Sequence, residues 1–438
     1  MRTTKWLGLA LLLAGLAGAT AGTLAVNTNV NLAFTYYNAF LLVPNFSDKE
    51  RQYLLARSWE GELLEARVGE LVSRYSNSFK LMRQAANSTA ACDWGGNLAE
   101  GPAMELPRLA RAKHLSQMAL LEATWHMQNG HPAAARDDLL AVLALGRNVA
   151  RDDLLISALV GIAIHAMVTG SIAVNFYQLD LETLQPVAAV LEKYPGDTMA
   201  RTMRTEKYLH LERYIEQIQR LHEQHPGHDS EVLRRFREAF PRDPEAEASG
   251  DKETSPVERL IRAAGGTSAG LLRLYSEAEP VYDEMAAMMI LPYSQYLSRV
   301  EALLKRAKAS TNPLIPAVAS LDKARRREFR VLVSFAMVRA AVEYRRRGVE
   351  GLDSVMDPCG TGPFAFKRFA LQGVHRGFEL QSAANDNGAG TLIFVEKAGV
   401  PFLVTGPRAG QIREPYEPKA TEKAFQKRYG ILPAGTNR

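Results

Sequence analysis

Apolar residues recur at intervals of three and four along most of this chain, with charged residues between them, as on one face of an α-helix. Five stretches follow this spacing: about Lys49 to Ala86, Leu106 to Tyr177, Leu181 to His225, Val257 to Arg306 and Ser320 to Arg347. We therefore predict a mainly α-helical protein.

The spacing changes after Gly348, where apolar and polar residues alternate in short runs separated by Gly, Asn and Asp. Alternation with a period of two is typical of half-buried β-strands. The runs are Phe364–Phe369, Gly377–Gln381, Thr391–Glu396 and Pro401–Thr405. They predict a small antiparallel β meander packed on the preceding helix, so the C-terminal end is expected to be an α+β domain.

A short internal echo lies in the second helical stretch. The sequence Ala-Arg-Asp-Asp-Leu-Leu occurs at residues 135–140 and again at 150–155, after a break at Gly130 and Pro132. Acidic pairs ahead of an apolar run favour helix N-termini, so each copy predicts the start of a helix. The pattern indicates stacked antiparallel helices, and one such αα unit resembles a tetratricopeptide (TPR) unit, although no 34-residue period continues along the chain.

Residues 154–177 contain no formal charge, and this length is enough to span a membrane. The same stretch contains His165 and several hydroxyl residues, together with Gly161 and Gly170, which would let neighbouring helices approach closely. We favour a buried helix at the centre of the helical domain, with a membrane span as the alternative.

The N-terminus has the pattern of a signal peptide. Arg2 and Lys5 precede an uncharged run rich in Leu and Ala at residues 6–18, and small residues at positions 19 and 21 suit cleavage after Ala21. The run is short for a bilayer span, although an uncleaved anchor is the alternative. We expect the mature protein in the periplasm or cell envelope, or secreted.

These patterns divide the chain into four parts. A signal peptide covers residues 1–21, a helical domain covers 22–319, a long helix with the meander covers 320–406, and a polar tail covers 407–438. Within the helical domain, residues 241–256 are polar and rich in Pro and Gly, so they are expected to form a mobile loop.

Composition and charge limit the partners. The chain has 438 residues with 47% hydrophobic and 23% charged residues, which are globular values, and a formal net charge of only +5. Basic residues gather on the helix around Lys323–Arg330 and at Arg345–Arg347, where we expect a solvated face or contact with anionic envelope polymers. The expected partner is a protein or envelope polymer rather than nucleic acid.

Two cysteines leave two alternatives open. In an oxidising compartment Cys92 and Cys359 are candidates for a disulfide, which would close a loop of more than 200 residues. The alternative is two separate buried thiols.

Residues with catalytic or metal-binding chemistry are few and scattered. His222, His225 and His228 are weak candidates for a metal site, because the zincin spacing is absent and the helix is expected to end at Pro226. Buried His165 is expected to be bonded to a neighbour. No catalytic residue and no cofactor is predicted.

Two stretches resemble known groups of proteins. The Cys-Asp-Trp-Gly loop at residues 92–95 and the helical block through residue 164 resemble a group of uncharacterised exported bacterial proteins, which implies a fold and no chemistry. In that loop, Trp94 is expected to fill the core and Asp93 to cap a turn.

The second resemblance lies at the C-terminal end. A helix around residues 341–344, the turn Asp-Pro-Cys-Gly-Thr-Gly-Pro at 357–363 and the run at 377–380 are similar to the globular head of type II secretion pseudopilins. Cys359 stands where that family has an aromatic residue, and no prepilin start precedes the N-terminal apolar run. The resemblance implies a helix with a small meander, and it implies no pilus role.

Together these features favour an exported cell-envelope binding or scaffolding protein. The alternative is an envelope hydrolase whose site gathers distant residues such as Asp93, His165 and the three clustered histidines.

Cleavage after Ala21 is checked by intact mass. The protein recovered from outside the cytoplasm should begin at Gly22 and lack the mass of the first 21 residues. A full-length mass in the membrane fraction would instead identify the N-terminal segment as an uncleaved anchor.

Overall fold

The computed structural model describes residues 31–57, 63–240, 255–384, 390–396 and 402–412. The signal peptide, the proposed loop up to residue 254 and the tail beyond 412 lie outside the described residues, and their predictions stay untested.

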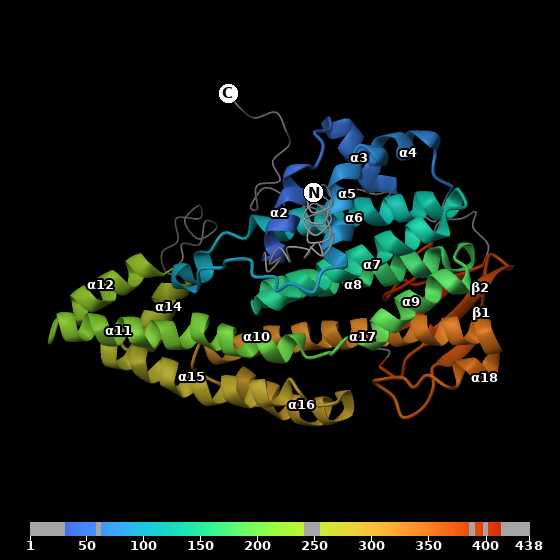
Figure 1. Ribbon diagram of the computed structural model, residues 1–438. Coiled ribbons are helices and arrows are strands. Elements are labelled where there is room, and N and C mark those ends of the chain that lie inside the picture. Colours follow the sequence, from blue (N-terminus) through green and yellow to red (C-terminus); the bar gives the residue numbers. More distant parts are fainter. Residues whose placement is uncertain (1–30, 58–62, 241–254, 385–389, 397–401, 413–438) are drawn as a thin grey trace, which may run out of the picture.

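Helices make up most of the described chain, as the apolar spacing predicted (Figure 1). They are α2 (Leu32–Leu41), α3 (Asp48–Arg57), α4 (Ala66–Ser73), α5 (Ser76–Ala86), α6 (Pro107–Gln128), α7 (Pro132–Val149), α8 (Leu155–Val174), α9 (Leu181–Glu192), α10 (Thr198–Lys207), α11 (Arg213–Gln224), α12 (Asp229–Ala239), α14 (Pro256–Ala263), α15 (Ser268–Met288), α16 (Tyr293–Ala309), α17 (Val318–Arg347) and α18 (Val349–Leu352).

Helices α6, α7 and α8 form a stack of consecutive neighbours at the centre of the molecule. The break between α6 and α7 lies at Gly130 and Pro132, as predicted. The prediction that each copy of the repeated sequence starts a helix is confirmed for the second copy and wrong for the first. Helix α8 begins directly after the second acidic pair, but α7 begins at Pro132, so Asp138 lies inside the helix with no exposed surface. Asp138 is therefore not a helix N-terminal residue.

Helix α8 is enclosed on several sides. It packs against α6, α7, α10, α17 and strand β3 (Thr391–Val395). Among the described residues it is the one helix long and apolar enough to cross a membrane, and 61% of its most apolar window is buried. This burial agrees with a core helix.

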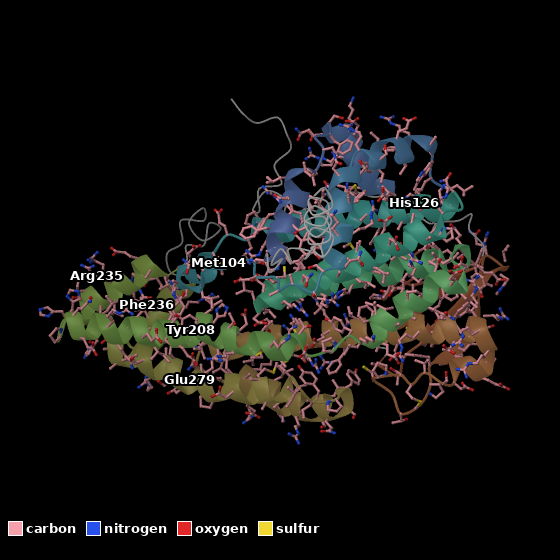
Figure 2. All side chains as sticks on the ribbon, in the orientation of Figure 1. Met104, His126, Tyr208, Arg235, Phe236 and Glu279 are labelled. Carbon is pink, nitrogen blue, oxygen red and sulfur yellow. The ribbon has the colours of Figure 1, made fainter. Side chains whose placement is uncertain are left out.

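A group of later helices extends the body on one side (Figure 1). Helices α10, α11, α12, α14 and α15 form an arm that ends far from the sheet, and Figure 2 places Arg235 and Phe236 there. Helix α17 connects the two ends, because it packs on α8 and α9 and also on α15 and α16.

The C-terminal end contains the predicted antiparallel meander. Strands β1 (Ala365–Leu371), β2 (Val374–Gln381) and β3 pair in the order β1-β2-β3. The fourth predicted strand is wrong, because residues 402–405 form only isolated bridges. They still run beside β3, where the Ile393 amide donates to the Val404 carbonyl at 2.8 Å.

The contact between α7 and α8 depends on glycine. A Cβ on Gly161 would lie 2.6 Å from the Gly146 carbonyl oxygen and 2.8 Å from the Ala150 Cβ, whereas a Cβ on Gly170 meets nothing within 4 Å. The close approach expected from small residues is thus confirmed at Gly161, while Gly170 faces open space.

Gly161→Ala should lower the free energy of unfolding by about 1–3 kcal/mol, because it overpacks a backbone contact. Gly170→Ala, on the same helix, should leave it unchanged or raise it by up to about 1 kcal/mol through helix propensity. Urea unfolding measures both variants. Equal stability of the two would contradict the close contact.

Candidate functional site

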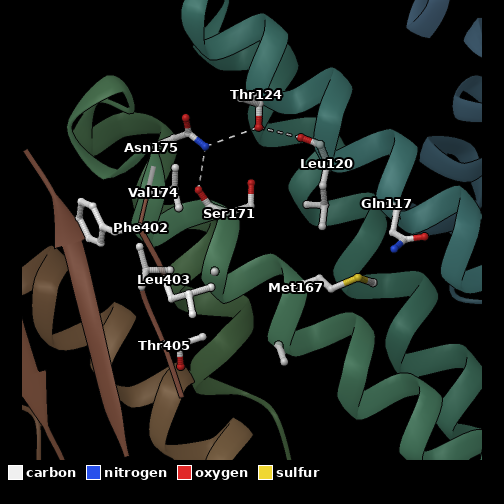
Figure 3. Close-up of a pocket in the computed structure, with 13 residues that line it drawn as sticks. Gln117, Leu120, Thr124, Met167, Ser171, Val174, Asn175, Phe402, Leu403 and Thr405 are labelled. Atoms are coloured by element: carbon white, nitrogen blue, oxygen red, sulfur yellow. Dashed lines mark hydrogen bonds between the residues drawn. The ribbon is translucent and has the colours of Figure 1, made fainter. Parts of the chain in front are cut away.

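A pocket lies where the helical body meets the end of the meander (Figure 3). Its volume is about 230 Å³. One wall is α6, the second is α8, and the third is the segment beside β3. The lining residues are Gln117, Leu120, Thr124, Ala166, Met167, Gly170, Ser171, Val174, Asn175, Phe402, Leu403, Val404 and Thr405.

The pocket exists because one face of α8 has small residues. Ala166, Gly170 and Val174 recur every four residues and so share one side of the helix. Gly170 leaves open space there, and the apolar segment at 402–404 covers the opening from the other side. One side of α8 is therefore buried in the core, and the other side lines the pocket.

Three polar side chains of the pocket, Thr124, Ser171 and Asn175, lie together at one end, whereas Gln117 and Thr405 lie apart from them (Figure 3). The Asn175 amide donates to the Ser171 carbonyl oxygen at 2.9 Å and to Thr124 Oγ1 at 3.5 Å, and Thr124 Oγ1 donates to the Leu120 carbonyl at 2.9 Å. The Ser171 hydroxyl is buried and has no hydrogen-bond partner among the described residues. A buried hydroxyl without a partner is costly, so this group is available to a ligand.

Among the described residues, no charged side chain lines the pocket. An apolar space with a few hydroxyl and amide groups is suited to a neutral ligand, because an ionised group would lose its hydration without gaining a counter-charge.

The three weak metal candidates are not brought together as a ligand set. His222 Nδ1 lies 3.1 Å from Ser268 Oγ, His228 Nδ1 lies 2.9 Å from the Pro226 carbonyl oxygen, and His225 follows the end of α11. The residues that do offer three close ligand atoms within the described chain are Glu122, His126 and Asp138, which the sequence analysis missed.

The two cysteines are not bonded to each other. Cys92 is half-buried beside the aromatic cluster of α2, and burial raises the pKa of its thiol to about 12. Cys359 lies in the turn before the meander, near Phe329 and Val333 of α17. The cysteines are therefore separate, as in the second alternative, but both are half-buried rather than buried.

The Cys-Asp-Trp-Gly loop anchors itself, as expected. The indole of Trp94 is buried, stacks on Tyr36 with ring centroids 5.7 Å apart, and donates to the Asn148 carbonyl at 2.9 Å. Asp93 accepts the Gly95 amide at 2.9 Å, which caps the turn. Both side chains thus have structural partners.

The basic stretch of α17 is not one solvated face. Arg325 is only 4% exposed, pairs with buried Glu328, and donates to the carbonyl oxygens of Gly196 and Leu291 at 3.1 and 3.2 Å. Arg345 likewise donates to the Phe176 carbonyl at 3.1 Å. These arginines fasten α17 to neighbouring segments, so the expectation of a solvated face is wrong for them.

His165 is a core residue bonded to a neighbour, as expected. Its Nε2 lies 3.2 Å from the Leu143 carbonyl oxygen, and its ring packs against Tyr194 and Phe335 at 5.1 and 5.5 Å between centroids. Burial lowers the pKa of His165 to about 4, so the ring is neutral at pH 7.

Comparison with known proteins identifies no relative: no family model, no curated protein and no solved structure matches this chain.

His165 should make the fold acid-sensitive. The pKa of His165 is about 4 in the folded chain and 6.5 in the unfolded chain, so the unfolded chain binds the proton at a higher pH. The free energy of unfolding therefore falls as the pH is lowered from 6.5 to 4. The loss is about 3 kcal/mol. In urea unfolding at several pH values, His165→Gln should flatten the dependence between pH 4 and 6.5.

The matched control is Phe335→Leu, which disturbs the same packing without a titrating group. It should lower the free energy of unfolding by a similar amount at every pH. An unchanged slope for His165→Gln would show that this ring does not cause the acid sensitivity.

Proposed function

We propose that this protein is an exported cell-envelope binding protein, and that its pocket holds a short acyl chain that ends in a neutral polar group, such as an ester or amide. The observation that carries the proposal is the apolar pocket between α6, α8 and residues 402–405, with Thr124, Ser171 and Asn175 grouped near one end. A partner that bears such a chain, a lipid-linked envelope component, would be held by its tail.

The shape of the pocket supports a chain rather than a ring system. Its α8 wall extends from Ala166 to Val174, which is about 12 Å at the rise of an α-helix. A cavity of roughly 150 Å³ holds one benzene ring. A volume of about 230 Å³ drawn out along two helical turns is therefore narrow, and it suits an extended chain.

The polar end supports a neutral head group. The Ser171 hydroxyl can donate to a carbonyl oxygen, and the Asn175 side-chain oxygen, for which no protein donor exists among the described residues, can accept an N–H. Neither group would compensate the desolvation of a carboxylate.

Export and scaffolding remain parts of this proposal. The signal-peptide pattern supports export, and the helical stack with its long arm offers extended surface for a protein or envelope polymer. We also retain the TPR-like arrangement of α6–α8 and the pseudopilin-like C-terminal end as proposals. The buried side chain of Asp357 accepts the Ala383 amide at 2.7 Å and so joins the turn before the meander to the end of β2.

The hydrolase alternative receives less support. Asp93 caps its own turn, and His165 is enclosed in the core. The histidines at 222–228 lie at the end of α11, where His222 and His228 have separate local partners. We therefore favour binding over catalysis.

Octanamide should bind to the purified protein with 1:1 stoichiometry in isothermal titration calorimetry, and octanoate should bind at least tenfold more weakly because no described residue that lines the pocket is a cation. Gly170→Leu fills the open space beside α8 and should weaken octanamide binding at least tenfold without loss of stability.

The matched control is Gly362→Leu, which also adds a side chain where nothing lies within 4 Å but is not in the pocket. It should leave octanamide binding unchanged. The pocket assignment is wrong if octanamide does not bind, or if Gly170→Leu binds it as tightly as the unaltered protein.

A further inference from the structure

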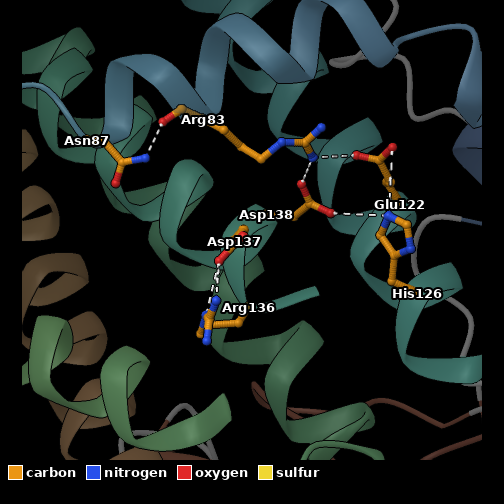
Figure 4. Close-up of polar contacts among 7 residues, drawn as sticks. All are labelled: Arg83, Asn87, Glu122, His126, Arg136, Asp137 and Asp138. Carbon is orange, nitrogen blue, oxygen red and sulfur yellow. Dashed lines mark hydrogen bonds and ion pairs between the residues drawn. The ribbon is translucent and has the colours of Figure 1, made fainter. Parts of the chain in front are cut away.

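Three side chains with metal-ligand chemistry meet between α5, α6 and α7, on a different face of α6 from the pocket (Figure 4). Glu122 and His126 lie four residues apart on α6, and Asp138 comes from α7. One ligand atom of each lies within 4.8 Å of the others. Figure 2 places His126 near the end of α6, away from the arm.

Arg83 of α5 divides the carboxylate oxygens into two sets. Its Nη1 lies 3.1 Å from Glu122 Oε2 and in contact with Asp138 Oδ1. The other oxygen of each carboxylate faces the imidazole instead: Glu122 Oε1 lies 4.0 Å and Asp138 Oδ2 lies 3.9 Å from His126 Nε2. The arginine thus binds one oxygen of each acid, and the other oxygen of each lies on the side of the histidine.

The free oxygen of Asp138 is an independent sign of a missing partner. The Asp138 side chain has no exposed surface, and its Oδ2 has no hydrogen-bond partner among the described residues. A buried carboxylate oxygen without a hydrogen-bond partner is costly unless a cation lies beside it.

The net charge of the cluster also favours a bound cation. When both carboxylates are ionised, they share the single guanidinium of Arg83, so the cluster carries one net negative charge in a largely buried place. A bound cation would balance this charge.

We propose that Glu122, His126 and Asp138 bind one divalent transition-metal ion, and that the ion is zinc. Zinc binds imidazole nitrogen and carboxylate oxygen at about 2.0–2.2 Å, which separates tetrahedral ligand atoms by roughly 3.4 Å. The two separations from His126 Nε2 exceed this by about half an ångström, so small side-chain rotations suffice.

Arg83 is a positioning residue in this site. It holds the outer oxygen of each carboxylate ligand, as partners beyond the ligand shell commonly do in metal sites. The His126 side chain is 25% exposed and Glu122 12% exposed, so a water molecule or ligand can reach the fourth position. An imidazole ligand favours zinc over calcium or magnesium, which prefer oxygen.

Titration of metal-free full-chain protein with zinc tests the site. Calorimetry and metal analysis should give one zinc per chain, and zinc should raise the melting temperature. His126→Gln and Asp138→Asn should each weaken zinc binding at least tenfold. The matched neighbours His131→Gln and Asp137→Asn, both exposed, should bind zinc like the unaltered protein.

Two variants, His126→Gln and His222→Gln, make the zinc titration decisive. If Asp138→Asn does not fold, as circular dichroism would show, His126→Gln decides the question, because it removes a partly exposed side chain and leaves Arg83 paired. His222→Gln should not affect zinc binding. Absence of stoichiometric zinc, full binding by His126→Gln, or calcium binding as tight as zinc binding would overturn the proposal.

Discussion

The rest of the fold depends on the enclosure of one helix without charges. Helix α8 has no ionisable residue other than His165, so water cannot solvate its sides well and the chain must cover them. Helix α7 does so through the Gly146–Gly161 contact, and α17 covers another side while linking the arm to the sheet. The small residues that permit this enclosure also leave the gap at Gly170.

Much of the architecture could be predicted from periodicity. The change from a spacing of three and four to a spacing of two located the meander, because burial on one face imposes the period of the element. The break at Gly130 and Pro132 and the role of Trp94 also followed from local chemistry. The run at 402–405 failed as a strand because alternation alone does not supply a continuous partner ladder.

The metal cluster could not be predicted in the same way, because it depends on side chains from three helices. Glu122 and His126 are four residues apart on one helix, which was an available signal. Asp138 was misleading because the acidic pair suggested a helix start, whereas α7 begins six residues earlier at Pro132. Only the packing of α5 against α7 shows that Arg83 reaches this aspartate.

Helix α6 connects the two proposed sites. Glu122 and His126 face α5 and α7, while Leu120 and Thr124 face the pocket, and at about 100° per residue these pairs lie on roughly opposite sides of the helix. Helix α6 also packs closely on α7 and α8 between these two faces. Arg83 fixes it to its neighbours, so the ionic cluster supports the wall against which a bound chain would lie.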